Sequence, residues 1–346
     1  MAAVARSRPG PQAPRLGSHS VPSMTLGGLD PAISTAENYR EWAKEARGRS
    51  PAYESLATLV ADDDTILRFL GTLPSAKRQP NLLFAAARYL LGSPPNITTL
   101  RALVSEKPAA LARVMLARRT QTNEPARCAT LLPALAQLPP PLALIEVGAS
   151  AGLTLLFDRY SYDYAGHLLA GSDADAPTLR CTPRGPVPVP GQLPVIAWRA
   201  GLDLNPLDVT DDDDVRWLSC LVWPGEEDRQ QRLAAAVASA RRAPPAVHRG
   251  DLVTDLPALA AQAPAGATLV IFHSAVLPYV EPEERGRFID TVRGLPGVWL
   301  SNEAPGVVPG ISLPRRPGGP FLLIRDGETP LAYTDGHGAW VQWLAN

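Results

Sequence analysis

The sequence predicts an α/β protein in which a doubly wound, mostly parallel sheet follows an all-helical unit. Apolar residues recur at helical spacing over residues 30–138, where no strand is evident. Over residues 139–346, short apolar strands alternate with helices, and the first strand, 142–147, runs directly into a turn between two glycines. Alternation of this kind builds a parallel sheet with helices on both faces and places the ligand at the carboxyl ends of the strands.

The composition favours a globular protein and gives no support for binding nucleic acid or a membrane. The 346 residues are 45% hydrophobic, and a formal net charge of −1 provides no field that would attract nucleic acid or an anionic membrane. The apolar runs fall well short of the ~20 residues that a transmembrane helix needs. Three widely spaced cysteines, Cys128, Cys181 and Cys220, predict neither a disulfide framework nor a metal site. We therefore expect a cytoplasmic protein, with its oligomeric state left open.

The helical unit is predicted from its capping signals. Residues 1–29 contain arginines but no acidic residue and are broken by prolines, which predicts a disordered tail. Ser34 and Glu37 have the spacing of a capping box, and Ser50 before Pro51 starts a second helix. Further helices are expected over 64–70, 81–91, 97–104, 108–119 and 126–137.

The α/β part is expected to contain five core strands and three terminal ones. A Pro- and Gly-rich passage at about 160–194 predicts a β-hairpin excursion between the first two core strands. The core strands are expected at 142–147, 195–206, 246–252, 268–273 and 298–302, and the terminal ones at 321–325, 331–334 and 340–343. The helices are expected at 153–159, from 211, at 228–242 and at 283–293.

Polar residues stand at the ends of these predicted strands. Glu146 precedes the turn Gly148-x-x-x-Gly152, Asp203 ends the second strand, and Asp251 ends the third. Because the carboxyl ends of parallel strands share one edge of a sheet, these groups should converge there. A nucleoside ligand needs such a set: glycines for close backbone approach, a carboxylate for the ribose hydroxyls and a polar group for the adenine.

At these residues the sequence resembles class I S-adenosylmethionine-dependent methyltransferases, which have a Rossmann-like sheet. Residues 146–152 are similar to their first motif, 201–206 to the ribose-binding strand end and 250–252 to the adenine-contacting segment. The resemblance covers residues 142–346 and implies S-adenosylmethionine as the cofactor. The residues that it implies for cofactor binding are Glu146, Gly148, Ala149, Ser150, Gly152, Asp203, Leu204, Asn205, Asp251, Leu252 and His273.

The acceptor site is expected at the ends of the fourth and fifth strands. His273 and Glu303 are the candidate catalytic bases, and Ser274 and Asn302 the candidate substrate-binding residues, all facing one cleft. A neutral structural role for His273 is an equally good interpretation. The predicted function is methyl transfer to a small-molecule acceptor, with a non-catalytic adenosyl-binding protein as the alternative. No spacing of His, Cys and carboxylates resembles a metal site.

The same turn also allows a different chemistry. Residues 148–152 satisfy Gly-x-Ser-x-Gly, the nucleophile elbow of α/β-hydrolases, with Ser150 as the nucleophile. The chain order Ser150, Asp251, His337 would fit a catalytic triad. One observation opposes this hypothesis. In α/β-hydrolases the elbow follows a strand deep in the sheet, with earlier strands before it, whereas in this sequence everything upstream of residue 139 is predicted to be helical.

A second resemblance covers nearly the whole chain. Residues 77–83, 142–152, 196–208, 272–277 and 302–306 are similar to an uncharacterised bacterial family known only as a domain of unknown function, number 2332. This resemblance implies the architecture and brings no activity with it.

Overall fold

The N-terminal part of the protein is helical, as the sequence predicts. The computed structural model describes residues 33–311, 313, 316 and 318–344, so the tail expected at 1–29 lies outside the described residues. The helices are α1 (Thr35–Ala46), α2 (Pro51–Ala61), α3 (Asp64–Gly71), α4 (Pro80–Leu91), α5 (Ile97–Glu106), α6 (Pro108–Ala117) and α7 (Arg127–Leu135), with the 3₁₀ turn η1 (Ser75–Lys77).

Local capping explains where several of these helices begin. The Ser34 side chain accepts a hydrogen bond from the backbone of Glu37, whose own carboxylate accepts one from the Ser34 backbone, which confirms the capping box. At α3 the Asp63 side chain is the N-cap, and it accepts from the amides of Thr65 and Ile66. Pro51 occupies the first turn of α2, where its missing N–H costs no hydrogen bond.

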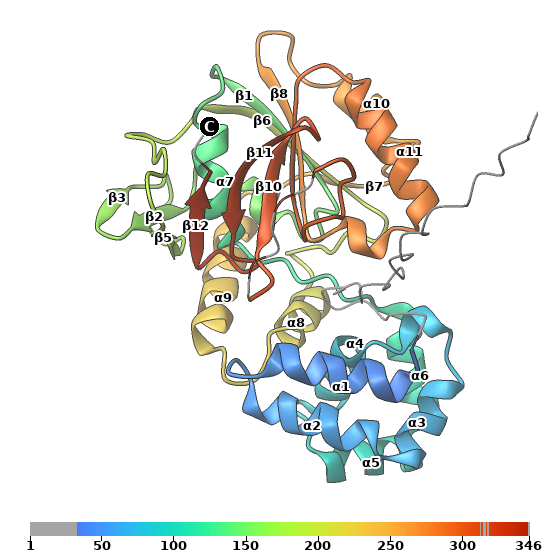
Figure 1. Cartoon of the computed structure of the whole chain (residues 1–346). Helices are drawn as coiled ribbons and strands as arrows, with labels where there is room; N and C mark the ends of the chain where they lie inside the picture. The colour runs from blue at the N-terminus through green and yellow to red at the C-terminus, as the bar shows by residue number, and fades with distance from the viewer. Residues whose placement is uncertain (1–32, 312, 314–315, 317, 345–346) are drawn as a thin grey trace, which may run out of the picture.

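The second part is built on a largely parallel nine-stranded sheet in the order β5-β12-β11-β10-β9-β8-β1-β6-β7 (Figure 1). The five strands from β9 to β7 are parallel. From β9 through β10 and β11 to β12 each pair is antiparallel, and β5 pairs with β12 in parallel. The strands are β1 (Leu142–Val147), β5 (Thr182–Pro183), β6 (Ile196–Asp203), β7 (Val247–Arg249), β8 (Thr268–Ser274), β9 (Val298–Glu303), β10 (Phe321–Arg325), β11 (Thr329–Thr334) and β12 (Trp340–Trp343).

The direction of strand addition reverses at β1. From β1 the chain moves outward to β6 and β7, and then returns to add β8 and β9 on the opposite side of β1. The crevice at such a reversal is where open α/β sheets bind their ligands. The strand order therefore marks the carboxyl ends of β1, β6 and β8 as the candidate ligand-binding edge.

Helices cover both faces of the sheet (Figure 1). Ala143, Ile145 and Val147 of β1 pack into a cluster with α10 (Leu256–Ala260) and α11 (Pro282–Arg293). Leu142 and Leu144 of the same strand belong to the other cluster, together with α7 and α9 (Glu227–Arg242). Side chains alternate between the faces of a strand, so both faces of β1 are buried and its near-continuous apolar sequence is explained.

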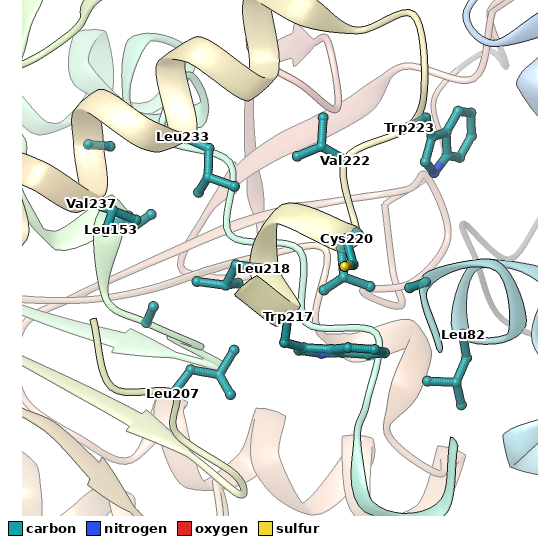
Figure 2. Close-up of a cluster of buried hydrophobic side chains, with 14 of the residues drawn as sticks. Leu82, Leu153, Leu207, Trp217, Leu218, Cys220, Val222, Trp223, Leu233 and Val237 are labelled. Carbon is teal, nitrogen blue, oxygen red and sulfur yellow. The ribbon is translucent and has the colours of Figure 1, made fainter. Parts of the chain in front are cut away.

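The helical unit and the sheet share one hydrophobic core. Trp217 of α8 (Asp212–Cys220) lies between Leu82 of the helical unit and Leu153 and Leu207 of the α/β part (Figure 2). Trp217 is fully buried, and its indole N–H donates to the carbonyl of Arg119 at 3.0 Å. The predicted helical unit is therefore packed directly onto the sheet domain.

One predicted helix is wrong. Residues 153–159 form only a single 3₁₀ turn, η2 (Leu153–Leu155). The carbonyl of Leu153 accepts from the hydroxyl of Tyr160, and that of Leu155 from the guanidinium of Arg199. Tertiary hydrogen bonds thus use carbonyls that a longer helix would need for its own backbone.

The excursion between β1 and β6 is a small sheet. β2 (Ser161–Tyr164) and β3 (His167–Leu169) form the expected hairpin, and β4 (Thr178–Arg180) adds to β2 in parallel. Beyond them, β5 pairs with β12 at the edge of the main sheet. The third core strand, expected at 246–252, is shorter than predicted: β7 ends at Arg249, before Gly250.

Candidate functional site

The turn after β1 has the backbone that its glycines predict. Gly148, Ser150 and Gly152 all have positive φ, at 70°, 52° and 70°. A β-carbon on Gly148 would lie 2.5 Å from a methyl group of Val276, so this position requires glycine for space as well as for φ. The N–H of Gly148 donates to the carbonyl of Leu202 at 2.8 Å, which ties the turn to β6.

Asp203, at the end of β6, anchors this turn. Its Oδ2 accepts from the N–H of Ser150 at 2.8 Å, which offsets the cost of holding a non-glycine residue in the left-handed region. Its Oδ1 accepts from the N–H of Asn205 at 2.7 Å and from Nε2 of Gln121 at 3.2 Å. The structure therefore brings together the glycine turn and the carboxylate that the sequence assigns to one ligand.

A segment that the sequence did not single out crosses this edge. We call residues 118–126, between α6 and α7, the strap. Lys77 Nζ donates to the carbonyl of Arg118 at 2.7 Å, and the Asn123 side chain accepts from the N–H of Leu153 at 2.8 Å. Between these points, Gln121 contacts both Asp203 and Asn205. In the sequence, the strap could have been suspected only from its polar residues, which lie between two apolar helices.

Glu146 is a buried carboxylate at the end of β1. Its Oε1 accepts from the Thr154 hydroxyl, and its Oε2 is buried without a partner in the described part of the chain. Burial raises the pKa of Glu146 to about 8, although the Thr154 hydrogen bond and the charge of Arg127 oppose the shift. A cationic group placed here would favour the ionised carboxylate.

The residues expected around the adenine form a turn. Asp251 Oδ1 accepts from the N–H groups of Val253 and Thr254, at 2.8 and 3.0 Å, and thus shapes the connection to α10. Leu252 packs partly against the α10 face of the core, whereas the Leu204 side chain is exposed. Among these residues only Leu204 offers an open apolar surface.

The expectation of one cleft for the acceptor residues is wrong. His273 packs against Phe288 of α11 and Trp299, whereas Ser274 accepts a hydrogen bond from Asn302 on the opposite face. Neighbouring residues in a strand point to opposite faces, so adjacent positions in β8 and in β9 are separated. His273 and Glu303 form one pair on the α11 side, and Ser274 and Asn302 another on the α7 side.

The His273–Glu303 pair is entirely buried. Nδ1 of His273 lies 2.7 Å from Oε1 of Glu303, and the same oxygen accepts from the N–H of Val276 at 2.9 Å. The pair thereby holds the turn after β8, in which Ala275 has φ 60°. This arrangement matches a structural histidine, with a carboxylate as its partner.

The geometry does not favour the hydrolase hypothesis. Ser150 is 3% exposed, and its hydroxyl donates to the carbonyl of Gln121 at 2.9 Å rather than to a histidine. Asp251 is engaged in its own turn, and His337 lies in the turn after β11, where its N–H donates to Asp335. The nucleophile–base contact that the mechanism requires is therefore missing among the described residues.

A network of buried ion pairs lies beside the strap. Glu124 accepts from Nε of Arg229 and Nε of Arg232, both at 2.7 Å, and Glu226 pairs with Arg229 and with Arg49. Although burial opposes the shift, the charges of Arg229 and Arg232 lower the pKa of Glu124. The network joins the turn after α1, the strap and α9.

Sequence reasoning also missed Arg127 and Glu45. Arg127, the first residue of α7, is 8% exposed and donates to the carbonyls of Ser274 and Gly336, both at 2.9 Å. Burial raises the pKa of Glu45 to about 7, opposed by the charge of Arg49. For Glu45 the sequence spacing could have indicated burial, because Glu45 follows the buried Trp42 by three residues and so lies near the inner face of α1.

The described residues contain no cluster of three or more His, Cys, Asp or Glu side chains that could hold a metal ion. They also contain no helix long and apolar enough to cross a membrane. All three cysteines are free thiols in buried positions.

Fold and site define a mixed α/β protein with a largely parallel sheet, an N-terminal helical unit and polar residues gathered at the carboxyl edge. The chain belongs to the family described as "Uncharacterized protein conserved in bacteria (DUF2332)", which it matches over residues 36–343. No curated protein and no solved structure matches the chain. The description of the family assigns no activity to its members.

Proposed function

We propose that the protein transfers a methyl group from S-adenosylmethionine to a small-molecule acceptor. The observation that carries the proposal is the contact between the left-handed turn after β1 and Asp203 at the end of β6. The order of strand addition reverses at β1, and in open parallel sheets a nucleoside ligand binds at the carboxyl ends of the strands beside such a reversal. The strand order β7-β6-β1-β8-β9 supports a Rossmann-like, methyltransferase-type sheet.

The donor set suits an adenosyl ligand that carries an ammonium group. Glu146 offers a buried carboxylate oxygen without a partner in the described chain, which an ammonium group would satisfy. Asp203 Oδ2 accepts a single hydrogen bond and retains capacity for a ribose hydroxyl. Gln121 donates to the other carboxylate oxygen of Asp203, Oδ1, and this hydrogen bond has to break if the ligand is to use both oxygens.

The acceptor would lie between this edge and the helical unit. S-adenosylmethionine, when bound, supplies an electrophilic methyl group, so the protein has mainly to position the acceptor for in-line attack. Glu45 lies close enough to Tyr279, just after β8, to act on its pKa, and with its own pKa near 7 it is suited to accept the acceptor's proton. We assign the buried pair of His273 and Glu303 a positioning role, because it holds the turn after β8.

Calorimetric titration of the full chain with S-adenosylmethionine and with S-adenosylhomocysteine tests the proposal. We expect binding of both, and a loss of at least about tenfold in affinity for Asp203→Ala, because a carboxylate-to-hydroxyl hydrogen bond contributes about 1.5–3 kcal/mol. Asp62→Ala is the matched control, since Asp62 is exposed and pairs with Arg40 on the helical unit. Absence of heat with either ligand would refute the proposal.

Turnover is tested separately by following labelled methyl groups into candidate small-molecule acceptors. Binding with no transfer to any of them would support the alternative function, a non-catalytic adenosyl-binding protein on the same scaffold. Under the methyl-transfer proposal, Glu45→Gln should lower turnover and leave the affinity for the adenosyl ligand unchanged, because Glu45 is assigned to the acceptor and not to the adenosyl ligand.

A further inference from the structure

We propose that Arg127 and His337 form a binding site for an oxyanion, the carboxylate or phosphate group of a small molecule, at the carboxyl end of β8. The site goes beyond the proposed methyl transfer, because it needs no adenosyl ligand to be occupied. The site is formed by the start of α7, the turn after β11 and the carboxyl end of β8.

Arg127 is a buried guanidinium with donors to spare. It has five N–H groups, and the hydrogen bonds to the carbonyls of Ser274 and Gly336 use two of them. Both partners are neutral, and no described carboxylate lies within ion-pair distance of Arg127. A cation that is 8% exposed is costly to bury without a counter-ion, so binding an anion beside Arg127 would offset this cost.

The nearest carboxylates are already engaged. Glu124 accepts from Arg229 and Arg232 and from the N–H of Ala126. Glu303 accepts from His273 and from two backbone amides on the α11 side of the sheet. Neither can turn toward Arg127 without leaving another buried donor unpaired. The charge of Arg127 also acts on Glu146, but Glu146 forms no ion pair with Arg127, and with its pKa raised to about 8 it is largely protonated at neutral pH. An external anion is therefore the fitting partner.

His337 supplies the second polar group. It follows Gly336, whose carbonyl accepts from Nε of Arg127, and the charge of Arg127 is among those that lower the pKa of His337, so the two side chains lie near each other. Its Nδ1 is buried and bonds no residue in the described ranges. A neutral imidazole can donate one hydrogen bond, and the three unused N–H groups of Arg127 can supply the others.

The surroundings carry an excess of positive charge. Burial lowers the pKa of His337 well below its ordinary value, and four guanidinium groups add to the effect: Arg229, Arg49, Arg127 and Arg232. Glu124 and Glu226 balance two of these charges. Glu45 also reaches this region, close to Tyr279, but its pKa near 7 leaves it partly protonated at neutral pH. A singly or doubly charged oxyanion would complete the balance.

Titration of the full chain with inorganic phosphate and, separately, with acetate tests the site, with chloride used to hold the ionic strength constant. We expect a saturable rise in Tm and a binding heat with at least one anion, and the better of the two identifies the phosphate or carboxylate source. Arg127→Gln should weaken this binding at least about tenfold, since it removes a charge-assisted hydrogen bond. Arg101→Gln, which removes an exposed guanidinium paired with Asp63, should leave it unchanged.

His337→Asn is the second variant, because it alters a turn side chain and leaves the Gly336 carbonyl in place. We expect a several-fold loss of anion affinity with a normal far-UV circular dichroism spectrum. The site is refuted by an absence of saturable binding beyond chloride, or by equal anion affinity in the wild type and in a folded variant of either residue. Because no adenosyl ligand is present, these outcomes are independent of the methyl-transfer test.

Discussion

Gln121 and Asp203, 82 residues apart in sequence, share a hydrogen bond of 3.2 Å between Nε2 and Oδ1. The same amide nitrogen donates to the carbonyl of Asn205 at 2.7 Å, and its oxygen accepts from the Asn205 side chain at 3.2 Å. The strap therefore holds the carboxylate that the proposed ligand would need, and ligand binding has to compete with Gln121.

Gln121→Ala should bind S-adenosylhomocysteine more tightly than the wild type does. The variant lacks the amide that occupies Asp203, and a net hydrogen bond of about 1 kcal/mol corresponds to roughly a fivefold gain. Calorimetric titration measures the change. Gln137→Ala is the control, because the Gln137 side chain donates to the carbonyl of Pro133 at the end of α7 and not to Asp203. Equal binding by Gln121→Ala would show that Gln121 does not compete with the ligand. Weaker binding would show that the strap contributes to the ligand site.

Glu146→Gln should be more stable than the wild type in alkaline solution. Burial raises the folded-state pKa of Glu146 from 4.5 to about 8, so its stabilising contribution is complete below pH 4.5 and is lost as the pH rises through 8. The shift corresponds to a loss on the order of 5 kcal/mol, which the amide avoids. Urea unfolding at pH 5 and pH 8.5 measures the difference, with the exposed Glu106→Gln as the control. A gap between variant and wild type that does not widen with pH would contradict the burial of a protonated Glu146.

Gly148→Ala should unfold more easily than Gly92→Ala. Both glycines have positive φ, 70° and 76°, so both variants carry the cost of about 1 kcal/mol for a left-handed alanine. Only at Gly148 would the new β-carbon meet Val276, 2.5 Å away. We expect an additional cost of about 1–3 kcal/mol from this overlap, measured by chemical denaturation. The double change Gly148→Ala with Val276→Ala should recover part of it, and no recovery would place the strain elsewhere.

Glu124→Ala should destabilise the protein by about 3–5 kcal/mol, because it leaves Arg229 and Arg232 buried without their shared partner. Asp62→Ala breaks an exposed ion pair and should cost less than about 1 kcal/mol. Thermal and denaturant unfolding of both variants provide the comparison. Similar small effects would mean that water reaches the network and screens it.

Much of the architecture could be predicted from local patterns. The capping box at Ser34, the buried strand before Gly148 and the apolar run of β8 were confirmed, because these elements depend on short-range spacing and burial. The helix expected at 153–159 was wrong, since Tyr160 and Arg199 take carbonyls from it through tertiary contacts. Spacing alone cannot reveal such competitors.

The candidate site divides in the same way. The polar residues that end the strands could be identified from the sequence, because a strand's polarity pattern and its glycines are local properties: Glu146, Asp203, His273 and Glu303 all lie at the predicted edge. Their surroundings depend on how the chain packs. It separated His273 from Ser274 by strand alternation, brought Gln121 of the strap onto Asp203, and buried Arg127 beside two carbonyls. These contacts join segments far apart in the chain, so their partners follow from packing and not from sequence spacing.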